Sequence, residues 1–154
     1  MEKNSSLRLV RRSPWLFHFN SGGCNGCDIE VVASLTPKYD VERLGAILTS
    51  SPKHADILVV TGPVTRQTLG SLRMIYDQIP EPKVVLAIGT CACSGGVFQG
   101  GYNVIGGVDK VLKNVICIPG CPPNPRMIYS IIKKFYENQL GGADENGSSK
   151  PEKE

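Results

Sequence analysis

Cysteine is the residue type in this sequence with the clearest capacity for chemistry. Six cysteines occur in 154 residues, and they are Cys24, Cys27, Cys91, Cys93, Cys117 and Cys121. Cys24 and Cys27 form a CxxC pair inside a glycine-rich stretch. Such a pair is compatible with a disulfide, a redox-active dithiol, a zinc knuckle or half of an iron–sulfur site. The pair alone leaves these chemistries open, so the other four cysteines have to distinguish them.

The composition narrows the choice. A hydrophobic content of 41% over this length is typical of one globular domain with a core. Residues 1–13 are polar and basic and lack the apolar core of a secretory signal, so we expect a reducing compartment, where clustered cysteines favour metal or redox chemistry. No apolar run approaches the roughly 20 residues needed to cross a bilayer. The net charge of +3 is small and scattered, and we expect no nucleic-acid partner.

The elements that must position the cysteines alternate along the chain. Predicted strands span residues 15–19, 56–61, 83–88 and 115–118. Predicted helices span residues 28–35, 65–79 and 125–140, with Thr65 as an N-cap, and residues 39–44 are ambiguous. This alternation predicts an α/β fold, in which a parallel sheet is buried on both faces in a three-layer sandwich. We place this domain at 13–140, between a flexible N-terminal segment at 1–12 and a disordered tail at 141–154.

Five of the six cysteines follow the carboxyl end of a predicted strand. Parallel strands end at one edge of their sheet, so these five thiols are expected to converge there. Cys117 is the exception, because it lies inside the predicted strand 115–118, where a free cysteine usually serves as a small apolar side chain.

Three kinds of site compete for these thiols. A zinc ribbon uses two close CxxC pairs, whereas here the later cysteines come from separate loops. A thioredoxin-like dithiol fits a CxxC between strand and helix, but it does not need Cys91 and Cys121 at the same edge. A [4Fe–4S] cluster takes four thiolates that can be distant in sequence, and it is the favoured interpretation, with the other two left open.

Glycines accompany the cysteines. Gly23, Gly26 and Gly120 are expected to lie against the cofactor, where a residue without a side chain lets the backbone approach closely and direct its N–H groups at sulfur. The alternative is that these are ordinary turn glycines. No GxGxxG motif opens a helix, so a dinucleotide-binding fold has no support.

Three motifs resemble one family. Cys24-Asn25-Gly26-Cys27, Gly89-Thr90-Cys91 and Pro119-Gly120-Cys121-Pro122-Pro123 look like the small subunit of membrane-bound, energy-converting [NiFe] hydrogenases of the Ech, formate-hydrogenlyase and archaeal types. The similarity runs from about residue 13 to residue 140. It implies a flavodoxin-like domain that holds one proximal [4Fe–4S] cluster.

The resemblance also implies which residues bind that cluster. The four metal ligands carried over are Cys24, Cys27, Cys91 and Cys121. Cys93 occupies no usual ligand position and is expected to be a bystander. No catalytic residue is expected, since the nickel centre would belong to another subunit.

The resemblance implies a function and partners. The chain would transfer electrons between a [NiFe] large subunit and a ferredoxin-like iron–sulfur subunit, during hydrogen evolution or oxidation coupled to ion movement by membrane-arm subunits. It would lie at the cytoplasmic face of the cell membrane, attached through the complex. The related alternative is the complex I subunit that carries the terminal cluster before quinone, and that family has two adjacent cysteines where this chain has CxxC. A stand-alone thiol–disulfide enzyme is the alternative from another class.

Four other polar or aromatic residues receive expectations. Asp28 and Glu30 are expected to complement the dipole of the helix that follows the CxxC, with tuning of the cofactor or proton movement as the alternative. His18 is expected to be a packed core or edge residue, and His54 to be exposed.

The docking face for a partner is expected at the glycine-rich rim of the site. We assign Gly22, Trp15, Gly95 and Val97 to this rim, because an isolated domain of this size would leave that edge exposed.

Overall fold

A five-stranded parallel sheet forms the centre of the fold. A computed structural model describes residues 13–140. The predictions for the N-terminal segment 1–12 and the tail 141–154 concern residues outside this range. In the described part of the chain, no helix is both long and apolar enough to span a lipid bilayer.

The main sheet has the order β2-β1-β3-β5-β7, and every neighbouring pair is parallel. Its strands are β1 (Trp15–Asn20), β2 (Ile47–Leu48), β3 (Ile57–Thr61), β5 (Val84–Ile88) and β7 (Val115–Ile118). Counted within this sheet alone, the order is 2-1-3-4-5, which is the flavodoxin-like arrangement. The strands β3 and β5 are buried along their whole length, as their β-branched and apolar sequences predict.

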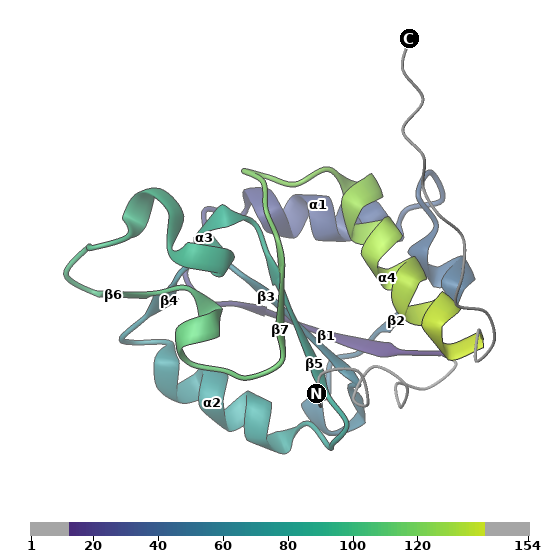
Figure 1. Cartoon of the computed structure of the whole chain (residues 1–154), viewed down its shortest axis with the longest axis horizontal. Coiled ribbons are helices and arrows are strands. Elements are labelled where there is room, and N and C mark those ends of the chain that lie inside the picture. Colours follow the sequence, from purple (N-terminus) through teal and green to yellow (C-terminus); the bar gives the residue numbers. More distant parts are fainter. Residues whose placement is uncertain (1–12, 141–154) are drawn as a thin grey trace, which may run out of the picture.

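Within residues 13–140, four α-helices and four short 3-10 helices connect the strands. The α-helices are α1 (Gly26–Leu35), α2 (Leu69–Gln78), α3 (Thr90–Ser94) and α4 (Pro125–Leu140). The 3-10 helices are η2 (Val41–Leu44), η3 (Pro52–His54), η4 (Gly96–Phe98) and η5 (Val108–Lys110). Figure 1 shows α1 and α4 on one side of the sheet and α2 on the other, so the predicted three-layer sandwich is confirmed.

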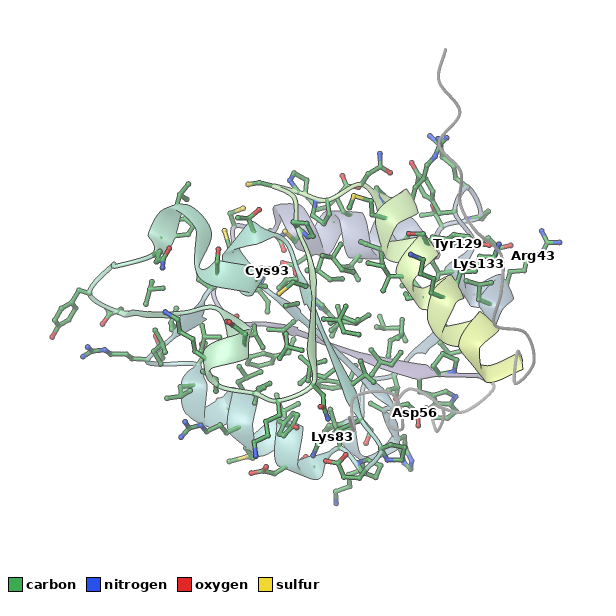
Figure 2. The ribbon with its side chains drawn as sticks, viewed as in Figure 1. Arg43, Asp56, Lys83, Cys93, Tyr129 and Lys133 are labelled. Atoms are coloured by element: carbon green, nitrogen blue, oxygen red, sulfur yellow. The ribbon has the colours of Figure 1, made fainter. Side chains whose placement is uncertain are left out.

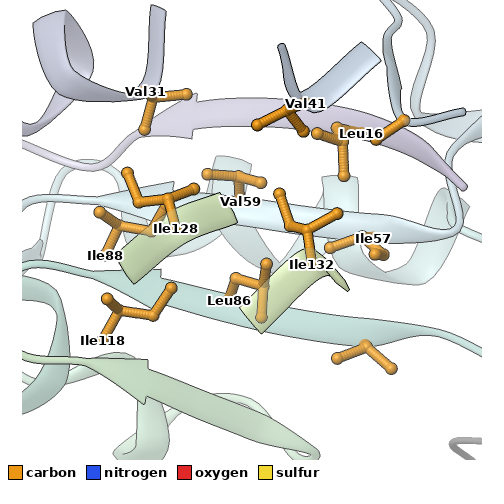
Figure 3. Packing of buried hydrophobic residues seen from close by; sticks show 12 residues of the cluster. Leu16, Val31, Val41, Ile57, Val59, Leu86, Ile88, Ile118, Ile128 and Ile132 are labelled. Carbon is orange, nitrogen blue, oxygen red and sulfur yellow. The ribbon is translucent and has the colours of Figure 1, made fainter. Parts of the chain in front are cut away.

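A hydrophobic cluster fills each side of the sheet. On the first side, Ile128 and Ile132 of α4 pack over Val59 and Leu86 of the central strands (Figure 3). On the second side, Leu72 of α2 and Ala92 of α3 pack with residues of β3 and β5. Alternate residues of each central strand contribute to opposite clusters, as the pleat of a strand requires.

A small second sheet lies beside the main one. The strands β4 (Val64–Thr65) and β6 (Val104–Gly106) pair in antiparallel fashion. This pairing keeps Thr65 in a strand, so the prediction that Thr65 caps a helix is wrong, and Thr68 occupies the N-cap position of α2. The Thr68 hydroxyl donates instead to the carbonyl of Ser21, at 2.9 Å, and thereby links α2 to the loop after β1.

Candidate metal centre

A cavity of about 190 Å³ lies at the carboxyl edge of the main sheet. Its lining residues come from the loops after four strands, and they are Gly23, Cys24, Asn25, Gly26, Cys27, Asp28, Thr61, Gly62, Thr90, Cys91, Gly120, Cys121 and Pro122. The four cysteines expected to bind metal all line this cavity, and so do the three glycines expected beside the cofactor. The predicted convergence is therefore present for four of the five thiols, and it is wrong for Cys93, which does not line the cavity.

Each of the four cysteines reaches the cavity by a different local structure. Cys24 lies in the loop after β1, and Cys27 lies in the first turn of α1, which begins two residues earlier than predicted. Cys91 is the second residue of α3, a five-residue helix that the sequence did not indicate. Cys121 follows β7 by three residues and is exposed. Thus two of the four thiols are fixed by helical turns and two are carried by loops.

Hydrogen bonds join the loops that carry Cys91 and Cys121. The backbone N–H of Thr90 donates to the carbonyl of Gly120 at 2.8 Å. The Thr90 hydroxyl lies 3.1 Å from the same carbonyl and 3.3 Å from the N–H of Gly120. Thr90 therefore fixes the distance between two segments that are thirty positions apart in the sequence.

A second set of bonds holds the loop that carries Cys24. The side-chain oxygen of Asn20 accepts from the N–H groups of Gly22, at 2.9 Å, and Gly23, at 2.7 Å. The buried Ser21 hydroxyl lies within hydrogen-bond distance of three carbonyls in the turn after β3, namely those of Thr61, Gly62 and Pro63. Ser21 thus fixes this loop to the end of β3, and Asn20 fixes its turn.

Asp28 connects both structures beneath the cavity. Its side chain is buried in the first turn of α1 and accepts hydrogen bonds from the Asn20 amide and the Thr61 hydroxyl. The Nε2 atom of His18 lies 2.8 Å from the same carboxylate. The helix-dipole expectation for Asp28 is compatible with its place in the first turn, but its main contacts are with β1 and β3. His18 is half-buried in this network rather than in an apolar core.

Glycine is required at position 89 by the sulfur of Cys27. Gly89 follows β5 directly and has a φ of +93°, and a Cβ there would lie 2.4 Å from Cys27 Sγ. A side chain at this position would therefore displace a cavity thiol, and the left-handed φ would strain it as well. Close backbone approach, which the sequence suggested for the glycines near the cysteines, is realised most clearly here.

Burial and mutual repulsion shape the electrostatics of the four thiols. The pKa of Cys27 is raised from 9.0 to about 11, first by burial and then by Cys24, Cys91, Asp28 and Cys121. The pKa of Cys91 is also raised, by burial and then by Cys121 and Cys24. Near neutral pH, thiols that raise one another's pKa in this way ionise together when a cation neutralises them, as bound metal does.

The spacing of the donors indicates what kind of metal group fits. Within residues 13–140, no three His, Cys, Asp or Glu side chains lie close enough together to bind a single metal ion. The four thiols nevertheless face one cavity, which Gly89 keeps free of side chain. A cluster of several metal atoms takes one thiolate on each metal atom and suits this spread of sulfur donors.

Cys93 and Cys117 lie outside the group of cysteines at the cavity. Cys93 and Cys117 do not line the cavity, in agreement with their exclusion from the ligand set. The expectation that Cys117 is a small buried side chain is wrong, because Cys117 is exposed on β7 at the edge of the sheet. A strand position predicted from sequence does not reveal whether the strand is central or at an edge.

Of the four residues expected at the docking rim, Gly22 and Val97 are exposed. Val97 follows the cavity segment of α3 and is 87% exposed. Trp15 begins β1, at the opposite end of the strand from the cavity, where its ring lies 6.0 Å from the exposed His54. Gly95 is buried, so neither Trp15 nor Gly95 belongs to an exposed rim at the cavity.

Three residues that support the cavity were not predicted from the sequence: Asn20, Thr61 and Thr90. Single polar residues after strands carry no distinctive pattern.

Known proteins resemble this chain over most of its length. The family described as NADH ubiquinone oxidoreductase, 20 kDa subunit, matches residues 24–135, which include all six cysteines. The chain is 51% identical over 121 residues to the probable membrane-bound hydrogenase subunit mbhJ of Pyrococcus furiosus, a match that covers 79% of this chain and 72% of the relative. It is 41% identical over 128 residues to a subunit of the NADH-quinone oxidoreductase of Amoebophilus asiaticus, covering 82% of this chain and 78% of the relative.

A solved structure agrees with these similarities. The fold superimposes on a chain of the membrane-bound sulfane sulfur reductase, an archaeal respiratory membrane complex, with a TM-score of 0.72 and 35% sequence identity. The match covers 94% of this chain and 80% of the solved one. The similarity in sequence is thus accompanied by similarity in fold.

Proposed function

The chain belongs to the family of the 20 kDa subunit of NADH ubiquinone oxidoreductase, and from this premise we propose that it is the electron-transfer small subunit of a membrane-bound [NiFe] hydrogenase complex. The observation that carries the proposal is the cavity shared by Cys24, Cys27, Cys91 and Cys121. The hydrogenase relative is more similar to the chain than the quinone-reductase relative, at 51% against 41% identity.

The four cavity thiolates would hold one [4Fe–4S] cluster. When bound, such a cluster accepts and donates single electrons. The chain's own residues supply the support: Thr90 fixes the Cys91 and Cys121 segments to each other, and Asp28 fixes the first turn of α1 to β1 and β3. The N-terminus of α1 faces the cavity, and the partial positive charge of a helix N-terminus stabilises negative charge on a group bound there.

The complex would place this chain in the middle of an electron path with two partners. A separate large subunit would hold the [NiFe] centre, and a ferredoxin-like iron–sulfur subunit would receive or supply electrons on the other side. Membrane-arm subunits would attach the assembly to the cytoplasmic face of the membrane. Peripheral attachment agrees with the finding that no helix within residues 13–140 could span a bilayer.

Iron counting on substituted chains tests the ligand set. The tagged chain, purified anaerobically, should contain about four irons and four sulfides, as one cubane requires. Cys121→Ser should lose most of the iron, because it removes one of four protein ligands, whereas Cys117→Ala should retain it. Equal iron loss in both variants would contradict the assignment, and so would a wild-type chain that folds with zinc in place of iron.

Activity of the intact complex tests the function. We expect hydrogen-dependent dye reduction by the complex that copurifies with the tagged chain, and its loss in the Cys121→Ser strain. The second candidate, a quinone-reductase subunit of the complex I type, is favoured by the description of the matching family. Reduction of quinone without any hydrogen-dependent activity would support that candidate, and reduction of a sulfane-sulfur compound would support a relative of the solved archaeal complex.

A further inference from the structure

Cys93 and Cys117 form a pair of thiols outside the metal cavity. They lie close enough for Cys117 to raise the pKa of the Cys93 thiol, although burial is the larger cause of that rise. Cys93 lies on α3 and points toward the sheet (Figure 2), where its sulfur also lies 3.5 Å from the carbonyl oxygen of Ala87 on β5. Neither sulfur lines the cavity, so this pair plays no part in the proposed ligand set.

The register of the sheet explains how the two thiols meet. Cys117 of β7 stands beside Ala87 of β5, and Ala87 belongs to the cluster on the α2 and α3 side of the sheet. Ile116 and Ile118 belong to the opposite cluster, so Cys117 points to the same side as α3. Cys117 is exposed because β7 is the edge strand of the sheet. Cys93 is half-buried, on the side of α3 that faces the sheet.

We infer that Cys93 and Cys117 are a site of reversible thiol modification, at which low-molecular-weight disulfides convert the two thiols into a disulfide. The exposed Cys117 is the thiol that reacts first, and Cys93 is the thiol that resolves the intermediate. A metal ion is a poorer occupant, because no third His, Cys, Asp or Glu in residues 13–140 completes a site around this pair.

The small disulfide is the oxidant in this reaction, and it is reduced to two thiols. The Cys117 thiolate attacks one sulfur of the small disulfide, whose S–S bond breaks to release one reagent thiol and leave a mixed disulfide on Cys117. Cys93 then loses its proton as its sulfur attacks the Cys117 sulfur, and the second reagent thiol is released. Two electrons and two protons pass from the protein thiols to the reagent, and an added dithiol reverses the exchange.

The position of the pair gives the modification a structural effect. A Cys93–Cys117 bond would join α3 to β7, two residues after Cys91 and four residues before Cys121. These are the two cavity segments that Thr90 already connects through Gly120. Oxidation would therefore add a covalent but reversible connection to the one that hydrogen bonds provide.

Peptide mapping of the full-length chain tests this inference. The iron-loaded chain is incubated anaerobically with glutathione disulfide, blocked with N-ethylmaleimide and digested with trypsin. We expect peptides 84–110 and 114–126 to become linked, with fragmentation assigning the bond to Cys93 and Cys117 rather than to Cys91 and Cys121. Dithiothreitol should remove the link, and the iron content should stay unchanged.

Two variants separate the roles of the thiols. In Cys93→Ser, the glutathione adduct should remain on Cys117, whereas in Cys117→Ser neither link nor adduct should form at Cys93. An unreactive Cys117, a wild-type adduct that never resolves, or a link only through cavity cysteines with loss of iron would each overturn the inference. None of these results depends on hydrogenase activity, so the function proposed above stands or falls separately.

Discussion

Two features of the structure require glycine at position 89. The Sγ atom of Cys27 lies 2.4 Å from where a Cβ of residue 89 would be, and the backbone φ there is +93°. Both features exclude an ordinary side chain. The glycine thereby connects a motif at the end of β5 to the CxxC that precedes it by more than sixty positions.

Gly89→Ala should therefore reduce cofactor loading and stability together. We expect iron per chain to fall severalfold, and the free energy of unfolding of the metal-free chain to fall by more than about 1 kcal/mol. Gly70→Ala is the matched control, since a Cβ at Gly70 of α2 would meet nothing within 4 Å. That control should keep its iron and gain up to about 1 kcal/mol. Similar iron contents in the two variants would contradict the role of Gly89.

The raised pKa of Cys27 predicts a pH dependence of stability in the metal-free chain. The thiol loses its proton near pH 9.0 when unfolded but near pH 11 when folded. The folded state thus holds the proton more tightly, so the contribution of Cys27 to stability is fully present below pH 9 and is lost as the pH rises toward 11.

Denaturant titrations under reducing conditions can measure this loss. Metal-free wild type should lose more stability between about pH 8.5 and 10.5 than metal-free Cys27→Ser does, because serine has no proton to release in that range. Superimposable pH profiles would show that the Cys27 thiol is not perturbed by folding.

At the level of single residues, the sequence predicted the cavity cysteines but not their supports. Cysteines stand out because few residue types bind soft metals, and their spacing after strands could be read directly. Asp28 could be placed in a helical first turn, but its bonds to Asn20 and Thr61 depend on the pairing of β1 with β3. Such bonds become visible only when the sheet is assembled.

The end of α2 depends on a buried lysine. Lys83 donates from Nζ to the carbonyls of Tyr76, at 2.8 Å, and Ile79, at 3.1 Å (Figure 2). Its ammonium group also lies 4.0 Å from the centre of the Tyr76 ring and 3.4 Å from the Glu81 carboxylate. A cation at a helix C-terminus satisfies carbonyls that have no partner within the helix.

Lys83→Met should destabilise the domain without affecting the cavity. The methionine keeps the apolar stem but removes the ammonium donor from the buried Ile79 carbonyl, which costs roughly 1–3 kcal/mol. The Tyr76 carbonyl keeps the N–H of Ile79 as a donor. Lys113→Met, at an exposed position, is the control and should change stability by less than about 0.5 kcal/mol. Thermal or denaturant unfolding of both variants measures the difference. A stable Lys83→Met protein would mean that water replaces the ammonium group.

The long elements were predictable and the short ones were not. The apolar runs of β3, β5 and β7 and the helical spacing of α4 lie in the sequence itself, and their predicted positions are confirmed within one residue. The strands β2, β4 and β6 have two or three residues each, and their pairing comes from tertiary contacts. The late start of α2 has the same cause, because Val64 and Thr65 pair with β6.

The molecule as a whole exposes apolar side chains beside the cavity. Val97 is 87% exposed, Tyr102 is 84% exposed and Phe98 is 47% exposed, and all three lie in the segment that follows α3. Ile29 and Val32 of α1 are also exposed, at 62% and 59%. Apolar surface of this kind marks protein interfaces. It replaces Trp15 and Gly95 as the expected contact for a large partner subunit.

Val97→Asp should weaken assembly of the complex. A charge buried in an interface is costly when it has no partner, so we expect the tagged variant to recover severalfold less partner protein at normal expression. Met74→Asp is the control, because Met74 is comparably exposed, at 63%, on α2. If both variants recover the same amount of partner, this surface is not the interface, which is expected to exceed about 2,000 Å².

The order of the cavity residues along the chain constrains when the site can form during synthesis. Cys24 leaves the ribosome early, but Cys121 follows it by 97 positions (121 − 24) and depends on β7, the last strand of the sheet. The helix α4 comes later still, and it covers one face of the sheet with Ile128 and Ile132. A nascent chain therefore presents its CxxC to the cell well before the remaining thiols can join it. If the four thiols bind one cluster as proposed, that cluster can assemble only after β7 has been synthesised.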